Sequence, residues 1–117
     1  MMVENTEVAV ASLNLTKALF VFALDVEIAG EFDRVNKLIT GCGKVNAAYE
    51  LTKAIHRHKP SLIINLGSAG SNQFKRGEVI CCTKFIQRDM DATGLGFKKY
   101  ETPFSGMAPE LNYGISL

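Results

Sequence analysis

The sequence predicts an α/β protein with a mostly parallel mixed sheet flanked by helices. Continuous apolar runs at 17–24, 61–66 and 77–87 have the β-branched and aromatic content of strands that are covered on both faces. A helical pattern of apolar residues over 44–58 lies between the first two runs, as the crossover between two parallel strands requires. The chain ends soon after the third run, so we expect the sheet to be incomplete at its C-terminal end.

Length, charge and cysteine content narrow the class of protein. The 117 residues suit one domain, predicted here as an N-terminal extension over 1–16 and the N-terminal part of a single domain over 17–117. A net charge of +1 without blocks of like charge indicates neither a nucleic-acid partner nor a membrane partner. The odd set of Cys42, Cys81 and Cys82 contains no CxxC pair, which favours reduced thiols in a cytoplasmic protein over disulfides or a metal site.

The first apolar run (KALFVFAL) ends at the acidic segment Asp25-Val26-Glu27. Two interpretations of Glu27 stay open at this point. A glutamate in the first turn of a helix over about 27–34 interacts favourably with the helix dipole, and Asp25 would cap that helix. Alternatively, Glu27 is a catalytic carboxylate at the carboxyl end of a strand, where α/β proteins bind their ligands.

A glycine-rich segment, Gly41-Cys42-Gly43-Lys44, follows a shorter strand predicted at 35–40. A phosphate-binding P-loop would need a glycine five residues before its Gly-Lys pair and a Ser or Thr after it. Leu38 and Val45 occupy those positions. The segment is therefore not a P-loop, and we expect its glycines to let the strand and the helix pack closely.

The segment Ser61 to Gly70 (SLIINLGSAG) is the strongest candidate for a binding loop. Four small residues, 67–70, follow its β-branched run. Small residues let backbone N–H groups approach a ligand closely, and the hydroxyl of Ser68 can donate or accept a hydrogen bond. A tight turn without a ligand accounts for the same residues, so both readings stay open.

A cluster of charged residues, Arg88-Asp89-Met90-Asp91, follows the third apolar run. Asp89 and Asp91 would pair as acid and base or bind a cation, or they belong to a solvated loop in which Arg88 neutralises part of their charge. Beyond the cluster the chain is rich in glycine and proline. The final residues, 112–117, are typical of the opening of another strand.

Three segments occur in the order found in the nucleoside phosphorylase and nucleosidase superfamily: GKVNAAYELTKAI, PSLIINLGSAGS and GEVICCTKFIQRDMDATGLGF. Over about 18–103 the chain resembles this superfamily, and within it most closely the N-terminal half of the 5′-methylthioadenosine/S-adenosylhomocysteine nucleosidases. The GSAG loop and the RDMDATGLGF block are the most specific parts of the resemblance.

The resemblance implies hydrolysis of the N-glycosidic bond of a purine nucleoside by a homodimer, without a metal or an organic cofactor. It implies that Glu27 orients the attacking water as the catalytic residue and that Ser68 helps to hold this water. The implied substrate-binding residues are Ser68, Ala69, Gly70, Gln87, Asp89, Leu95, Phe97 and Pro103. The last three match a segment that reaches into the pocket of the neighbouring subunit.

Two departures from the family pattern affect this prediction. The stretch between Glu27 and Lys44 is short, and the family's ribose-binding Met-Glu pair and Ser-Asp catalytic acid would lie beyond Leu117. Protonation of a leaving group by a general acid is typically worth about 10²- to 10⁴-fold in rate, so we expect a truncated member with little activity alone. The alternatives are a purine nucleoside phosphorylase and a catalytically dead nucleoside-binding remnant. Hydrolysis is favoured over phosphorolysis, because neighbouring aspartates compete with phosphate for Arg88.

Overall fold

The computed structural model of the chain describes residues 17–113. The predicted N-terminal extension, 1–16, and the last four residues of the strand expected at 112–117 lie outside this range. The described chain forms two compact units, 17–75 and 76–113, and each is described by itself.

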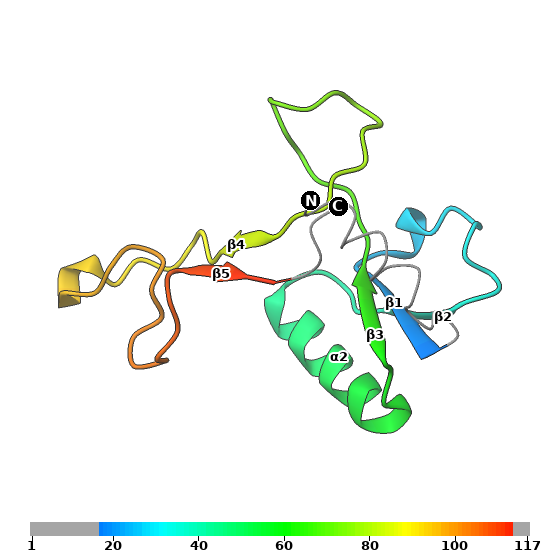
Figure 1. The fold of residues 1–117 in the computed structure, drawn as a ribbon, viewed down its shortest axis with the longest axis horizontal. Helices are drawn as coiled ribbons and strands as arrows, with labels where there is room; N and C mark the ends of the chain where they lie inside the picture. The colour runs from blue at the N-terminus through cyan, green and yellow to red at the C-terminus, as the bar shows by residue number, and fades with distance from the viewer. Residues whose placement is uncertain (1–16, 114–117) are drawn as a thin grey trace, which may run out of the picture. The chain divides into compact units, whose positions relative to one another are not determined.

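The first unit contains a three-stranded parallel sheet (Figure 1). Its strands are β1 (Ala18–Phe22), β2 (Asn36–Ile39) and β3 (Leu62–Asn65), in the order β2-β1-β3. The register pairs Val21 of β1 with Leu38 on one side and with Asn65 on the other. The predicted α/β class with a mostly parallel sheet is confirmed, and the carboxyl ends of all three strands lie at one edge.

The helix α2 (Lys44–His58) forms over the predicted residues. Three basic residues in its last turn complement the helix dipole, and it ends where Lys59 adopts a left-handed conformation with φ of 45° before Pro60. One side of the helix packs on the sheet. The residues of this core are Leu19, Val21 and Ala54, with the partly buried Leu38 and Leu51 against them.

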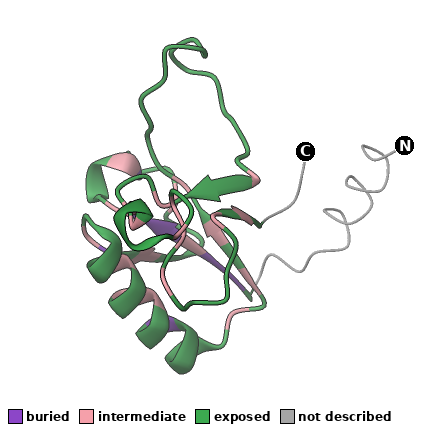
Figure 2. Ribbon diagram, turned by 90° about the vertical axis from the view of Figure 1, so that its left-hand side faces the viewer, coloured by how far each residue is buried: buried purple, intermediate pink, exposed green. Residues whose placement is uncertain are grey.

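The opposite face of the sheet is covered by the connection between β1 and β2. Phe22 is only 1% exposed, and its ring lies 5.0 Å from the ring of Phe32 in an edge-to-face arrangement. Ile28, in the same connection, is 4% exposed. Most of the buried residues of the unit therefore gather on β1 (Figure 2), because this strand alone has a neighbour on both sides.

The helix considered at 27–34 does not form. The chain makes a single 3₁₀ turn, η2 (Asp25–Glu27), and Ala29 and Gly30 then adopt left-handed conformations with φ of 50° and 76°. Successive residues with positive φ cannot continue a right-handed helix. Glu27 therefore does not lie in the first turn of an α-helix, and the interpretation of Glu27 as a glutamate that interacts with a helix dipole is wrong.

The prediction of a strand over 77–87 is wrong for most of these residues. In the second unit only β4 (Lys84–Ile86) is a strand, and it pairs with β5 (Glu110–Asn112) in an antiparallel sheet of its own. Gly77 has φ of 92°, and Val79 is 95% exposed. The apolar residues of 77–83 thus indicated a buried strand that the described chain does not form.

The rest of the second unit consists of turns and one 3₁₀ helix, η3 (Thr93–Leu95). The ring of Phe97 packs edge-to-face on that of Phe104, with 5.2 Å between the ring centres. In the part of the chain that the structure describes, no helix combines the length and the apolarity needed to cross a bilayer.

Candidate active site

Glu27 lies just beyond the carboxyl end of β1, in η2. Its side chain turns back toward the strand, and Oε2 accepts hydrogen bonds from the backbone N–H groups of Ala23 at 3.2 Å and Leu24 at 3.1 Å. The bond to Leu24 corresponds to one half of a capping box at the start of η2, because the leucine side chain cannot accept the reciprocal bond. The backbone after β1 therefore holds one of the two carboxylate oxygens in place.

The other oxygen connects Glu27 to the loop after β3. Oε1 accepts a hydrogen bond from the backbone N–H of Ser68 and another from its hydroxyl, each at 3.0 Å. The two residues are 41 positions apart in the sequence. They meet because β1 and β3 are parallel neighbours and end at the same edge of the sheet.

The hydrogen bonds lower the pKa of Glu27 from its ordinary value of 4.5. The backbone N–H of Ser68 has the largest effect, followed by the N–H of Leu24 and the Ser68 hydroxyl, while partial desolvation acts in the opposite direction. No charged side chain is among the causes of this shift. The carboxylate is therefore ionised at neutral pH and accepts hydrogen bonds on both oxygens.

Acidification is expected to remove the stability that Glu27 contributes. Its pKa is lower in the folded chain than in the unfolded chain, so its contribution is complete above 4.5 and is lost as the pH falls through the lowered pKa. Unfolding temperatures measured from about pH 7 down to about pH 3 should show Glu27→Gln below the unchanged chain at neutral pH, with the difference shrinking toward the acid end. Replacement of the exposed Glu31 by Gln is the control. A Glu27→Gln deficit that stays constant with pH would contradict the expectation.

The structure places the predicted site residues in two groups. Ala69 and Gly70 continue the exposed loop that begins at Gly67 and Ser68. Five further predicted residues belong to the second unit, and the structure gives them no position relative to Glu27: Gln87, Asp89, Leu95, Phe97 and Pro103. Their predicted contacts with substrate, and those of the loop, stay predictions.

The second-unit residues have contacts of their own. The amide oxygen of Gln87 accepts a hydrogen bond from the hydroxyl of Thr102 at 3.2 Å. The neighbouring carboxylate of Asp91 accepts from the hydroxyl and the N–H of Thr93, and these bonds lower the pKa of Asp91. Leu95 is 78% exposed. In this unit Asp91 thus caps a turn, which is the use of a carboxylate typical of a solvated loop.

Sequence reasoning missed three participants at the edge where Glu27 lies. The N–H groups of Ala23 and Leu24 bind the carboxylate, and Gly67 lies so close that its missing side chain leaves room for Oε1. The capping-box signature has a Ser or Thr three residues before the glutamate, and Leu24 stands there, so the sequence carried no specific signal for the two N–H groups. The contact with Gly67 depends on the pairing of β1 with β3.

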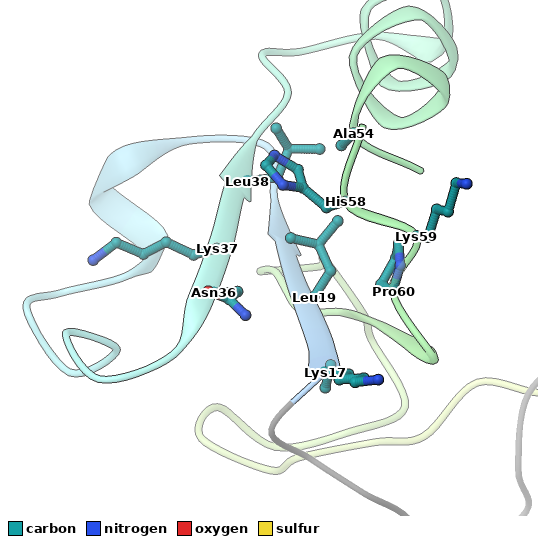
Figure 3. Close-up of a pocket in the computed structure, with 10 residues that line it drawn as sticks. Lys17, Leu19, Asn36, Lys37, Leu38, Ala54, His58, Lys59 and Pro60 are labelled. Carbon is teal, nitrogen blue, oxygen red and sulfur yellow. The ribbon is translucent and has the colours of Figure 1, made fainter. Parts of the chain in front are cut away.

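A groove of about 560 Å³ opens at the opposite end of the sheet, where the strands begin (Figure 3). Leu19, Leu38 and Ala54 give it an apolar floor, and His58 lies beside them. Among the described residues that line it there is no Asp or Glu. The groove therefore offers no carboxylate to orient a water molecule, and Glu27 and Ser68 remain the candidate site.

Fold and site together define a class. The chain is an α/β protein whose parallel sheet presents an ionised carboxylate and a loop of small residues at the carboxyl ends of adjacent strands, the edge at which open α/β sheets bind ligands. The chain belongs to the phosphorylase superfamily, whose sequence model matches residues 18–114.

Curated relatives make the comparison more specific. The chain is 40% identical over 74 residues to the 5′-methylthioadenosine/S-adenosylhomocysteine nucleosidase of Exiguobacterium sp. (strain AT1b), a match that covers 62% of this chain and 31% of the relative. It is 39% identical over 66 residues to the nucleosidase of the same name from Staphylococcus haemolyticus, covering 55% and 29%. The match to the Bacillus thuringiensis nucleosidase is 38% over 74 residues, covering 62% and 31%. The chain thus spans about a third of the length of the curated relatives that it matches.

Proposed function

We propose that this chain carries the water-binding side of a nucleosidase site, which hydrolyses the N-glycosidic bond of a purine nucleoside such as 5′-methylthioadenosine or S-adenosylhomocysteine. The observation that carries the proposal is the pair of hydrogen bonds from Ser68 to Oε1 of Glu27. The names of the relatives supply the substrate class.

The chemistry explains why this pair suits hydrolysis. Cleavage of a glycosidic bond passes through an oxocarbenium-like state, which a water molecule then attacks at the sugar carbon. The lowered pKa of Glu27 makes it a weak base. Its role is therefore to orient the water and to stabilise the positive charge of the sugar. The water passes its proton to the Glu27 carboxylate only as the new C–O bond forms, when the oxygen of the water becomes acidic.

Water must first gain access to the carboxylate. A carboxylate has about four lone-pair positions, and Glu27 accepts four hydrogen bonds, from the N–H groups of Ala23, Leu24 and Ser68 and from the Ser68 hydroxyl. Three of these donors are fixed in the backbone. The hydroxyl alone can rotate away, so we assign to Ser68 the exchange of its own hydrogen bond for one from the water.

Ser68→Ala is expected to act less severely than the loss of the carboxylate. The variant keeps the backbone N–H of residue 68 and loses the rotating hydroxyl, so water still reaches Oε1 but is held by one partner fewer. We expect adenine release to fall about tenfold, the worth of one hydrogen bond to a charged group. The matched control is Ser61→Ala, at the start of the same segment. A Ser68→Ala rate equal to that of the control would contradict the exchange.

The function is tested by product analysis with labelled 5′-methylthioadenosine. We expect the chain alone to release adenine slowly, and faster when the part of the Exiguobacterium relative outside the match is supplied as a separate chain. The sugar product is expected to be the free methylthiopentose with or without inorganic phosphate. A pentose 1-phosphate would indicate a phosphorylase instead, and release that is equal in the Glu27→Gln variant under both conditions would indicate a remnant without catalytic function.

Two further predictions concern the state of the protein. We propose that the chain assembles as a homodimer, as the family resemblance implies, and that it acts in the cytoplasm, as its odd set of three cysteines favours. Within the described sheet, β2 and β3 are the outer strands, and each has one side without a strand partner, which supports pairing with a second chain.

A further inference from the structure

We propose that Gly67 is a positioning residue for Glu27: the absence of a side chain at position 67 leaves the space that Oε1 occupies. The inference deepens the proposed function and rests on it, because it explains how the water-orienting oxygen is kept in place. The small size of Gly67 then serves the carboxylate, in addition to any substrate in the loop.

The distances around Gly67 support this role. A β-carbon at this position would lie 3.2 Å from Oε1 of Glu27 and 3.6 Å from both Cδ and Oε2. Ordinary contacts of a β-carbon are 3.4–4 Å. An alanine would therefore press on the oxygen that Ser68 binds, and the oxygen would have to retreat by a few tenths of an ångström.

The carboxylate has no free direction in which to retreat. Oε1 is bound by both donors of Ser68 at 3.0 Å, and Oε2 is bound by the N–H groups of Ala23 and Leu24. A shift of a few tenths of an ångström takes the Ser68 bonds beyond the usual range of hydrogen-bond lengths. The alternative, a rotation of the carboxylate, takes Oε2 away from its backbone donors.

Gly70 provides a matched control in the same loop. A β-carbon on Gly70 would meet nothing within 4 Å. Neither Gly67 nor Gly70 is among the glycines with positive φ, so alanine suits the backbone at both positions. The two substitutions therefore differ in whether they press on Glu27.

The first test is a ¹³C NMR titration of the Glu27 carboxyl group in the 117-residue chain, with Glu27→Gln to assign the signal. No charged side chain contributes to the lowered pKa of Glu27, which depends on its hydrogen bonds. We expect the pKa to rise toward 4.5 in Gly67→Ala and to stay as in the unchanged chain in Gly70→Ala. Equal pKa values in all three proteins would overturn the proposal.

A double-substitution cycle separates positioning from general damage to the fold. Unfolding temperatures are compared for Gly67→Ala in the unchanged chain and in the Glu27→Ala background, where no carboxylate remains to be displaced. We expect Gly67→Ala to lower the unfolding temperature only in the presence of Glu27. A loss of the same size in both backgrounds would show that Gly67 is needed by the fold alone and would overturn the proposal.

Adenine release gives the link to function. A misplacement of about 1 Å in an active site can cost about 100-fold in rate, so we expect roughly a tenfold loss in Gly67→Ala relative to the unchanged chain. The titration and the unfolding measurements use no nucleoside. They therefore report on the placement of Glu27 even if the adenine assay shows that the proposed function is wrong, and an unchanged rate with a raised pKa would overturn the functional part of the inference.

Discussion

Glu27→Gln is expected to reduce adenine release by about 100-fold or more, the usual range for loss of a group that assists proton transfer. In Glu27 each carboxylate oxygen accepts two hydrogen bonds. The amide nitrogen of glutamine is a donor, so it cannot accept the two bonds of the oxygen that it replaces. The variant also lacks the negative charge that stabilises the oxocarbenium-like sugar. The measurement is the rate of labelled adenine release, with and without the remaining part of the Exiguobacterium relative.

Glu31→Gln is the control for this prediction. Glu31 is an exposed carboxylate in the same connection, four residues further along the chain, so its replacement changes the net charge equally without touching the candidate site. We expect the control to retain the rate of the unchanged chain. If the two variants lose activity to the same extent, the loss reflects charge alone and Glu27 has no special role.

Phe22→Ala is expected to destabilise the first unit by about 3–5 kcal/mol, the usual cost of truncating a buried phenylalanine. The ring is 1% exposed and packs edge-to-face on Phe32, so its removal leaves a cavity between β1 and the connection to β2. Since domains are stable by only about 5–15 kcal/mol in all, the loss is expected to unfold a measurable fraction of the protein. The measurement is the urea concentration at the midpoint of unfolding, followed by the circular dichroism of the helix α2.

Phe74→Ala provides the matched control, because Phe74 belongs to the same unit and is 48% exposed. The same atoms are removed in both variants, but about half of the surface of Phe74 is already in contact with water. We expect a shift of the urea midpoint well below that of Phe22→Ala. Similar midpoints in the two variants would show that the ring of Phe22 contributes no more to the core than an exposed ring does.

The pair of predictions separates the two uses of β1. Phe22, at the end of β1, is buried and contributes to stability. The residues just after β1 bind the carboxylate of Glu27 through their backbone N–H groups. Phe22→Ala is expected to act on stability first and on activity through it, and Glu27→Gln to act on activity at a pH where most of the protein stays folded. Measurement of both quantities for both variants tests this division.

Local patterns predicted the elements whose signals lie within their own residues. The helix over 44–58 forms over its predicted residues, because its apolar spacing and its end before Pro60 are local signals. The apolar runs around β1 and β3 were strong for the same reason. The strand prediction for 77–83 is wrong because apolar content indicates burial but does not show which strand would pair with the segment. In the described chain Val79 is 95% exposed.

The amino-acid sequence alone determined that this chain is an α/β protein of the phosphorylase superfamily and that Glu27 and Ser68 follow parallel strands. These features reside in local residue patterns, such as the GSAG loop, and in their order along the chain. Only the tertiary structure decided that the carboxylate closes four hydrogen bonds and lies against Gly67. The physical reason is that the two bonds from Ser68 and the contact with Gly67 depend on the register of β1 against β3, which brings together residues 41 positions apart. The bonds from Ala23 and Leu24 depend on the direction of the Glu27 side chain, and neither feature leaves a periodic trace in the sequence.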